Sequence, residues 1–201
     1  MTVSNLAFTS RYNHGMSLAY DARLNLQLLV ALLNSAPGIA GSADALATPE
    51  ALNRFAAEHG FTGPIEASVF DVAAAAELRE RFQIALEGDV ELVVGAINQT
   101  MSEIRAFPHL VRHGEWGWHT HMTGDTAPLG ERMASDIAQA LIDLVRFGDL
   151  ARLRRCAAAD CDAALADFTK NQSKRFCDVR NCANRTHIAT YRARTNAQGA
   201  H

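Results

Sequence analysis

The sequence lacks several features that would assign its 201 residues to a familiar class of protein. No apolar run approaches the roughly 20 residues that a helix needs to cross a bilayer, so we expect no association with a membrane. The first residues show no basic stretch followed by an apolar one, so we expect no signal peptide. The expected location is therefore a reducing cytoplasm, where clustered cysteines are more often metal ligands than disulfides.

Catalytic motifs are absent as well. The sequence contains no glycine-rich phosphate loop, no H-E-x-x-H and no G-x-S-x-G, and no acid, base and nucleophile are brought together in it. We therefore expect a protein that is not an enzyme. The 48% of hydrophobic and 20% of charged residues are typical of an ordinary globular chain.

Cysteine is missing from most of the chain and then occurs four times in its last quarter. Cys156 and Cys161 form one C-x4-C pair, and Cys177 and Cys182 form a second pair fifteen residues later. Two short loops that each supply two thiolates suit one tetrahedral zinc ion. Four cysteines fill every position, so the pattern predicts one structural Zn²⁺ without room for an activated water. Buried free thiols or a thiol switch are the alternatives, since such a site can release its metal on oxidation.

The net charge of -3 conceals two parts of opposite sign. From residue 151 onward there are ten Lys or Arg and four Asp or Glu, whereas the preceding residues contain nine and eighteen. Four zinc-bound thiolates and the ion lower the formal charge of the tail from +6 to about +4. An acidic body joined to a basic tail indicates that the tail is the part that meets a polyanion.

Most of the chain before the cysteines shows the pattern of helices. Apolar residues at helical spacing predict helices over 17–34, 48–59, 71–87, 90–105 and 128–147. Thr48 followed by Pro49 is a strong helix start, and Gly60 is a matching stop. After Cys182, the sequence has helical potential up to Arg194 and is basic.

A short stretch between residues 107 and 122 has a different pattern. Strand-favouring residues, among them Leu110, Val111, Trp116, Trp118 and Thr120, lie on either side of Gly114 and Glu115. They predict a small β-hairpin. The expected fold class is therefore mainly α with a small β-hairpin. A helical domain over residues 1–150, with a sensory or regulatory role, precedes a small four-cysteine zinc finger over residues 151–201.

Two asparagines and two tryptophans are candidates for a small-molecule pocket in the helical domain. Asn34 and Asn98 each lie among apolar residues of a predicted helix, and Trp116 and Trp118 are expected to pack inward beneath the hairpin. These four residues form our candidate effector pocket. The alternative is that the amides complete helix ends or core hydrogen bonds, and that the hairpin only covers the helices.

The same hairpin also contains a pair of histidines. Because side chains alternate along a strand, His119 and His121 are expected on the same face, as a metal site on a strand requires. No carboxylate or cysteine repeats nearby at ligand spacing, so the sequence favours a plain amphipathic hairpin over a second metal site.

The cysteine segment resembles a known family, the CGNR zinc finger. The motif that names it stands here as Cys182-Ala183-Asn184-Arg185, with Ala in place of Gly, and the basic-aromatic step Lys174-Arg175-Phe176-Cys177 precedes it. The stretch from Asp167 to Asn171 also fits the framework. Alanine is harmless at the glycine position if that position is helical, and strained if it needs a positive φ.

In this family the finger follows a mostly helical domain described as a putative stress-induced transcription regulator (ABATE). Residues 1–150 resemble that domain in length, in helical order and in leading directly into the first cysteine. The resemblance implies a bacterial transcriptional regulator of the stress response that binds DNA through the finger. Its helical domain would sense a small-molecule effector or form a homodimer.

The basic residues of the finger are the candidates for DNA contact. Phosphate contacts are expected from Arg175, Arg180, Arg185, Arg192 and Arg194. Asn184 could read an adenine edge, although a helix cap is the more usual role. Arg185 could instead offset the zinc-thiolate charge by hydrogen bonding to sulfur.

The alternative function is that of a structural or protein-interaction module, in which the basic finger docks on the acidic helical domain. Arginines that face the helical domain would favour docking, whereas an exposed basic stripe would favour DNA.

Overall fold

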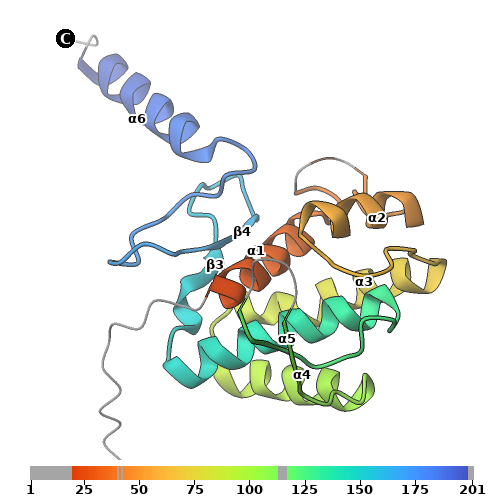
Figure 1. The fold of residues 1–201 in the computed structure, drawn as a ribbon. Coiled ribbons are helices and arrows are strands. Elements are labelled where there is room, and N and C mark those ends of the chain that lie inside the picture. The colour runs from red at the N-terminus through yellow and green to blue at the C-terminus, as the bar shows by residue number, and fades with distance from the viewer. Residues whose placement is uncertain (1–19, 40, 42, 113–116, 199–201) are drawn as a thin grey trace, which may run out of the picture.

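A bundle of helices forms the larger part of the protein, whose computed structural model describes residues 20–39, 41, 43–112 and 117–198. Helix α5 (Leu129–Phe147) lies at the centre, in contact with α1, α3 and α4 (Figure 1). The surrounding elements are α1 (Tyr20–Asn34), α2 (Pro49–Glu58), α3 (Val69–Phe82), the 3-10 helix η1 (Gln83–Leu86) and α4 (Val90–Glu103). Their apolar faces meet in one core, which includes the fully buried Leu26, Leu29, Phe82, Ile137 and Leu141.

Local capping explains where the helices begin and end. The Thr48 side chain accepts a hydrogen bond from Ala51 N and caps α2, as the sequence predicts. Ser68 and Asp71 form a capping box that starts α3 earlier than predicted. The predicted helix over residues 71–87 is divided, because α3 ends at Phe82 and η1 continues to Leu86.

A glycine allows α3 and α5 to approach closely near their N-terminal ends. A Cβ atom on Gly130 would lie 2.7 Å from the Cβ atom of Ala74, so no larger residue fits without a shift of the helices. The Gly130 backbone N–H donates to Asp71 Oδ1 over 2.8 Å. The two helix starts are thereby fixed to each other.

Two small antiparallel hairpins accompany the helices. Strands β1 (His109–Val111) and β2 (His119–His121) pair with His109 opposite His121, which confirms the predicted hairpin. The predicted turn at Gly114 and Glu115 lies outside the described residues. A second hairpin, which the sequence did not predict, pairs β3 (Leu153–Arg155) with β4 (Ala164–Ala166).

The β3–β4 hairpin is packed into the helical domain. Leu153, Ala164 and Ala166 are buried in the same core as the helices. The Asn34 side chain at the end of α1 exchanges two hydrogen bonds with the Ala164 backbone, from Nδ2 to the carbonyl oxygen (3.0 Å) and from the backbone N–H to Oδ1 (2.7 Å). The cysteine segment therefore begins within the helical domain.

The last helix, α6 (Cys182–Gln198), projects away from the body of the molecule (Figure 1). The chain is thus mainly α, as expected, and has two small strand pairs where one was predicted. Among the described residues, no helix is both long enough and apolar enough to cross a bilayer.

Candidate metal centre

The four cysteines lie together and are all buried. Their Sγ atoms are within 4.8 Å of one another, and the Cys161–Cys177 and Cys177–Cys182 sulfur pairs are each 3.7 Å apart. Four sulfurs bound to one tetrahedral zinc ion at about 2.3 Å lie about 3.8 Å apart. The four side chains therefore fit a single zinc ion with a closed, all-sulfur shell.

Each cysteine is positioned by a different local structure. Cys156 directly follows β3, and its N–H extends the hairpin by donating to the Ala163 carbonyl oxygen (2.8 Å). The Cys161 N–H donates to the Ala158 carbonyl oxygen (3.1 Å), which closes a turn. Cys177 arrives from the next loop, and its N–H donates to Cys156 Sγ (3.4 Å).

Cys182 is the first residue of α6, where the positive end of the helix dipole favours a thiolate. Burial raises the pKa of the Cys161 thiol to about 12. A thiolate there requires a cation beside it, and a bound Zn²⁺ supplies that charge. A zinc ion bound there would hold the two loops together through four buried sulfurs.

Arg185 is tied to the metal centre. Its guanidinium donates to Cys182 Sγ (3.5 Å) and forms two hydrogen bonds to the Asp160 carboxylate (2.7 and 2.8 Å). These partners, first Asp160 and then Cys182, hold the pKa of Arg185 above its ordinary value. Arg185 thus has the contact expected of a residue that offsets the thiolate charge.

A buried aspartate, whose role the sequence did not reveal, orders the loop between β4 and Cys177. Asp167 accepts hydrogen bonds from the Thr169 N–H and hydroxyl, from the Lys174 N–H and from the Arg154 guanidinium. Burial raises the pKa of Asp167, but these bonds outweigh it and hold the pKa below its ordinary value. Its position two residues before a threonine, an arrangement typical of side-chain turns, was the available signal.

The basic residues of the finger divide into two groups. Five pair with carboxylates, and they include residues that face the helical domain, such as Arg155 with Glu87 (2.8 Å). The paired residues are Arg152, Arg154, Arg155, Lys174 and Arg185. The other five are exposed and form no ion pair within the part of the chain that the structure describes; they are Lys170, Arg175, Arg180, Arg192 and Arg194.

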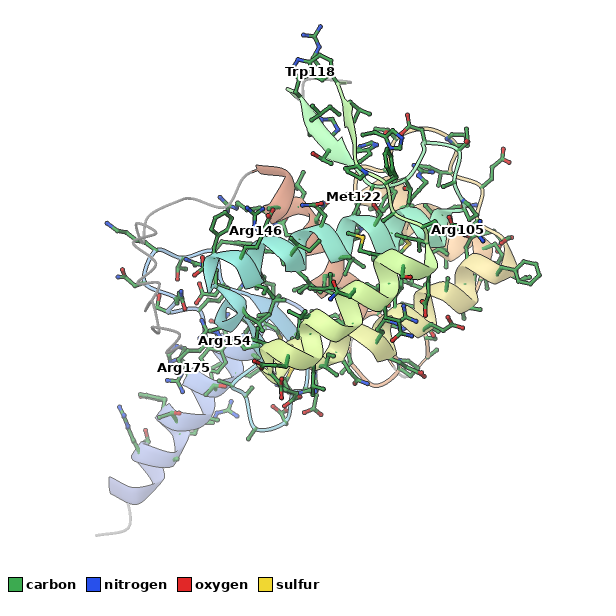
Figure 2. All side chains as sticks on the ribbon, turned by 90° about the horizontal axis from the view of Figure 1, so that it is seen from below. Arg105, Trp118, Met122, Arg146, Arg154 and Arg175 are labelled. Carbon is green, nitrogen blue, oxygen red and sulfur yellow. The ribbon has the colours of Figure 1, made fainter. Side chains whose placement is uncertain are left out.

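The exposed arginines occupy two places. Arg175 lies near the base of α6 and stacks over the Phe176 ring at 5.8 Å (Figure 2). Arg180 donates to the Asp160 carbonyl oxygen over 2.8 Å. Arg192 and Arg194 are exposed on α6 itself.

The start of α6 corrects one expectation and settles another. Asn184 lies inside the helix and is exposed, so it does not precede the helix as a cap would; Asn181, with φ 51°, comes before Cys182. Ala183 is helical, so its replacement of the family's glycine causes no strain.

The three described residues of the predicted effector pocket lie in separate places. Asn34 uses its amide to hold Ala164, and Asn98 is exposed on α4. Trp118 is 69% exposed at the outer end of the β1–β2 hairpin, where Figure 2 shows it pointing away from the helices. The prediction that Trp118 packs inward is therefore wrong. Trp116 lies outside the described residues.

A different cavity, of about 290 Å³, opens between α1, β2 and α5. Its wall is unusually polar and includes His59, His119, His121, Asp125, Arg132, Asp136, Gln139 and Asp143. Burial raises the pKa of Asp136 to about 7, although Arg132 and His119 act in the opposite direction. The sequence did not reveal this cavity, because its residues come from separate elements.

Comparison with protein families gives two matches that cover most of the chain. The model of the ABATE family, described as "Putative stress-induced transcription regulator", matches residues 26–148. The model of the CGNR zinc finger matches residues 152–195. No curated protein matches the chain.

Proposed function

Because the chain belongs to the ABATE family, described as "Putative stress-induced transcription regulator", and contains a CGNR zinc finger, we propose that it regulates transcription by binding DNA. In this proposal a structural zinc ion holds the finger, and α6 is the element that enters a groove. The observation that carries it is the projection of α6 from the body, with its side chains exposed from residue 187 to residue 195 (Figure 1).

The order of side chains around α6 suits the major groove. Because a helix advances 3.6 residues per turn, residues spaced by three or four places share one face. Asn184, Ile188, Tyr191 and Thr195 have this spacing and are exposed. Arg192 lies on one flank of that face and Arg194 on the other. A helix in the major groove presents its central face to base edges and its flanks to the two phosphate strands.

Unpaired positive charge supports the same conclusion. Arg175, Arg180, Arg192 and Arg194 are exposed and have no carboxylate partner among the described residues. The helical domain is acidic and repels a polyanion, whereas the basic finger attracts it, so the finger is the part expected to face DNA. Arg185 is the exception among the predicted contacts, because Asp160 and the thiolate already engage it.

Docking on the helical domain, the alternative function, accounts for the contacts of only one half of the finger. The β3–β4 hairpin is joined to the helical domain through Asn34 and through the Arg155–Glu87 pair. The arginines of α6 take no part in that contact. We therefore propose that docking anchors the finger and that α6 binds DNA.

The proposal has further parts. It includes no catalytic step, and it places the protein in the cytoplasm with the DNA. One helix in one groove makes few phosphate contacts, so we propose that two copies act together as a homodimer. The polar cavity of the helical domain, in place of the four residues first considered, is the proposed effector site.

The test is the affinity of the zinc-loaded full chain for duplex DNA across a salt series. Each phosphate contact contributes about -0.9 to the slope of log K against log salt concentration. Four arginines therefore predict a slope of about -3 to -4 per chain. A chain that binds duplex DNA with no salt dependence, or does not bind it, would exclude the proposal.

A further inference from the structure

Two imidazole nitrogens face each other in the cavity of the helical domain. His119 and His121 lie two residues apart on β2, so their side chains are on the same face of the hairpin. Their Nε2 atoms are 3.2 Å apart. Both residues line the cavity between the hairpin and α5.

The Nδ1 atom of each ring faces an oxygen acceptor. His119 Nδ1 is 3.0 Å from the Gly117 carbonyl oxygen, and His121 Nδ1 is 3.1 Å from Asp125 Oδ1. A carbonyl and a carboxylate only accept, so both Nδ1 atoms must donate. When both rings are neutral with hydrogen on Nδ1, the two Nε2 lone pairs face the same place, as ligands of one cation would.

The spacing and the surroundings match those of a bound metal ion. Two imidazole nitrogens held by one tetrahedral ion at about 2.0–2.1 Å lie about 3.3 Å apart. The hydrogen bond from His121 to Asp125 reproduces the carboxylate–histidine arrangement that orients metal-binding imidazoles. On the α5 side, the cavity wall adds the oxygen atoms of the Asp136 carboxyl group.

The wall also offers an acceptor that lacks a donor. Gln139 Oε1 is buried and has no hydrogen-bond partner in the described part of the chain. Buried acceptors are normally satisfied by protein or by ordered water. A water bound to an ion at the histidine pair would be a suitable donor within the same cavity.

We propose that His119 and His121 bind a divalent first-row transition-metal ion in this cavity. Imidazole ligands suit Zn²⁺, Ni²⁺ and Cu²⁺. Within the described residues, the four cysteines are the only group of three or more His, Cys, Asp or Glu side chains placed to hold one metal ion. The new site therefore has two protein ligands and open positions that face the cavity. Unlike the closed cysteine centre, it can accept water or an external ligand.

The inference does not depend on DNA binding, and its test uses metal alone. The full chain, prepared without a histidine tag and with one zinc per chain in the finger, is titrated with Co²⁺. We expect a second metal equivalent whose d–d absorption lacks the intense thiolate band of a cysteine site. His119→Gln and His121→Gln should weaken this binding at least tenfold, and Asp125→Asn about tenfold.

His109→Gln is the matched control, because His109 belongs to the same hairpin but does not line the cavity. It should leave Co²⁺ affinity unchanged. Imidazole ¹⁵N spectra of the wild-type chain test the site without any substitution. We expect hydrogen on Nδ1 of both rings and a change in the Nε2 chemical shifts when metal is added. The proposal is overturned if no second equivalent binds, if it survives both histidine substitutions, or if His109→Gln removes it equally.

Discussion

The two halves of the finger are held in place by different means. The first half, β3–β4 with Cys156 and Cys161, shares the core of the helical domain. The second half, residues 177–198, contributes Cys177 and Cys182 and continues into a helix that projects from the body (Figure 1). Without the metal, the first half would remain folded as part of the helical domain, whereas the second half depends on the metal centre for its position.

Few contacts besides the ion join these halves. The Cys177 N–H donates to Cys156 Sγ (3.4 Å), and Asp160 accepts hydrogen bonds from both Arg180 and Arg185. Exposed ion pairs of this kind contribute little to stability. Zinc is therefore the main connection between a rigid base and the helix that we propose to bind DNA.

The largest effect is expected from removing the metal. Zinc binding supplies on the order of 10 kcal/mol to small fingers, so chelation or Cys182→Ser should unfold α6. The helical domain should stay folded, because α5 and its core do not involve the cysteines. Amide hydrogen exchange should show loss of protection in residues 177–198 and retained protection in α5. Equal loss in both regions would show that the halves are not distinct.

A smaller effect is expected at the buried carboxylate of the loop that leads to Cys177. Asp167→Ala removes the partner of the Thr169 and Lys174 N–H groups and of Arg154. We expect a loss of about 3 kcal/mol in the free energy of unfolding, together with weaker zinc affinity. Denaturant unfolding and a competitive chelator titration measure the two quantities. Unchanged zinc affinity would show that the loop is positioned without this residue.

The contact between the hairpin and α1 should contribute less. Asn34→Ala leaves the buried N–H and carbonyl groups of Ala164 without their partner. We expect about 2 kcal/mol of destabilisation, measured by urea unfolding. Asn98→Ala, at an exposed position on α4, is the control and should change stability by less than about 0.5 kcal/mol. Similar losses for both variants would contradict the role assigned to Asn34.

The smallest effect concerns the position where the family motif has glycine. Ala183→Gly restores the motif, but the residue is helical, so glycine should cost up to about 1 kcal/mol. Thermal unfolding of the zinc-loaded full chain, followed by circular dichroism, measures the change. A stabilised variant would show that Ala183 is strained.

The sequence predicted what depends on local signals. Thr48 and Gly60 marked the ends of α2, and the cysteine spacing gave the metal centre. It did not predict β3 and β4, because three-residue strands with alanines carry little strand signal and are fixed by packing on α1.

Residues whose role depends on distant neighbours were also missed. Asn34 was expected in a pocket, but its partner lies 130 residues further along the chain. His119 and His121 are close in the sequence, but the cavity that they line is completed by residues of α1 and α5. Such contacts follow from the packing of elements and not from periodicity.

The contribution of α6 to the salt dependence of DNA affinity tests the central claim most directly. Arg192→Ser combined with Arg194→Ser should make the slope of log K against log salt concentration less steep by about 2. The control combines Arg54→Ser with Arg146→Ser, which removes two exposed arginines of the helical domain and should leave the slope unchanged. Equal slopes for the wild-type chain and the α6 variant would contradict a DNA-binding role for this helix.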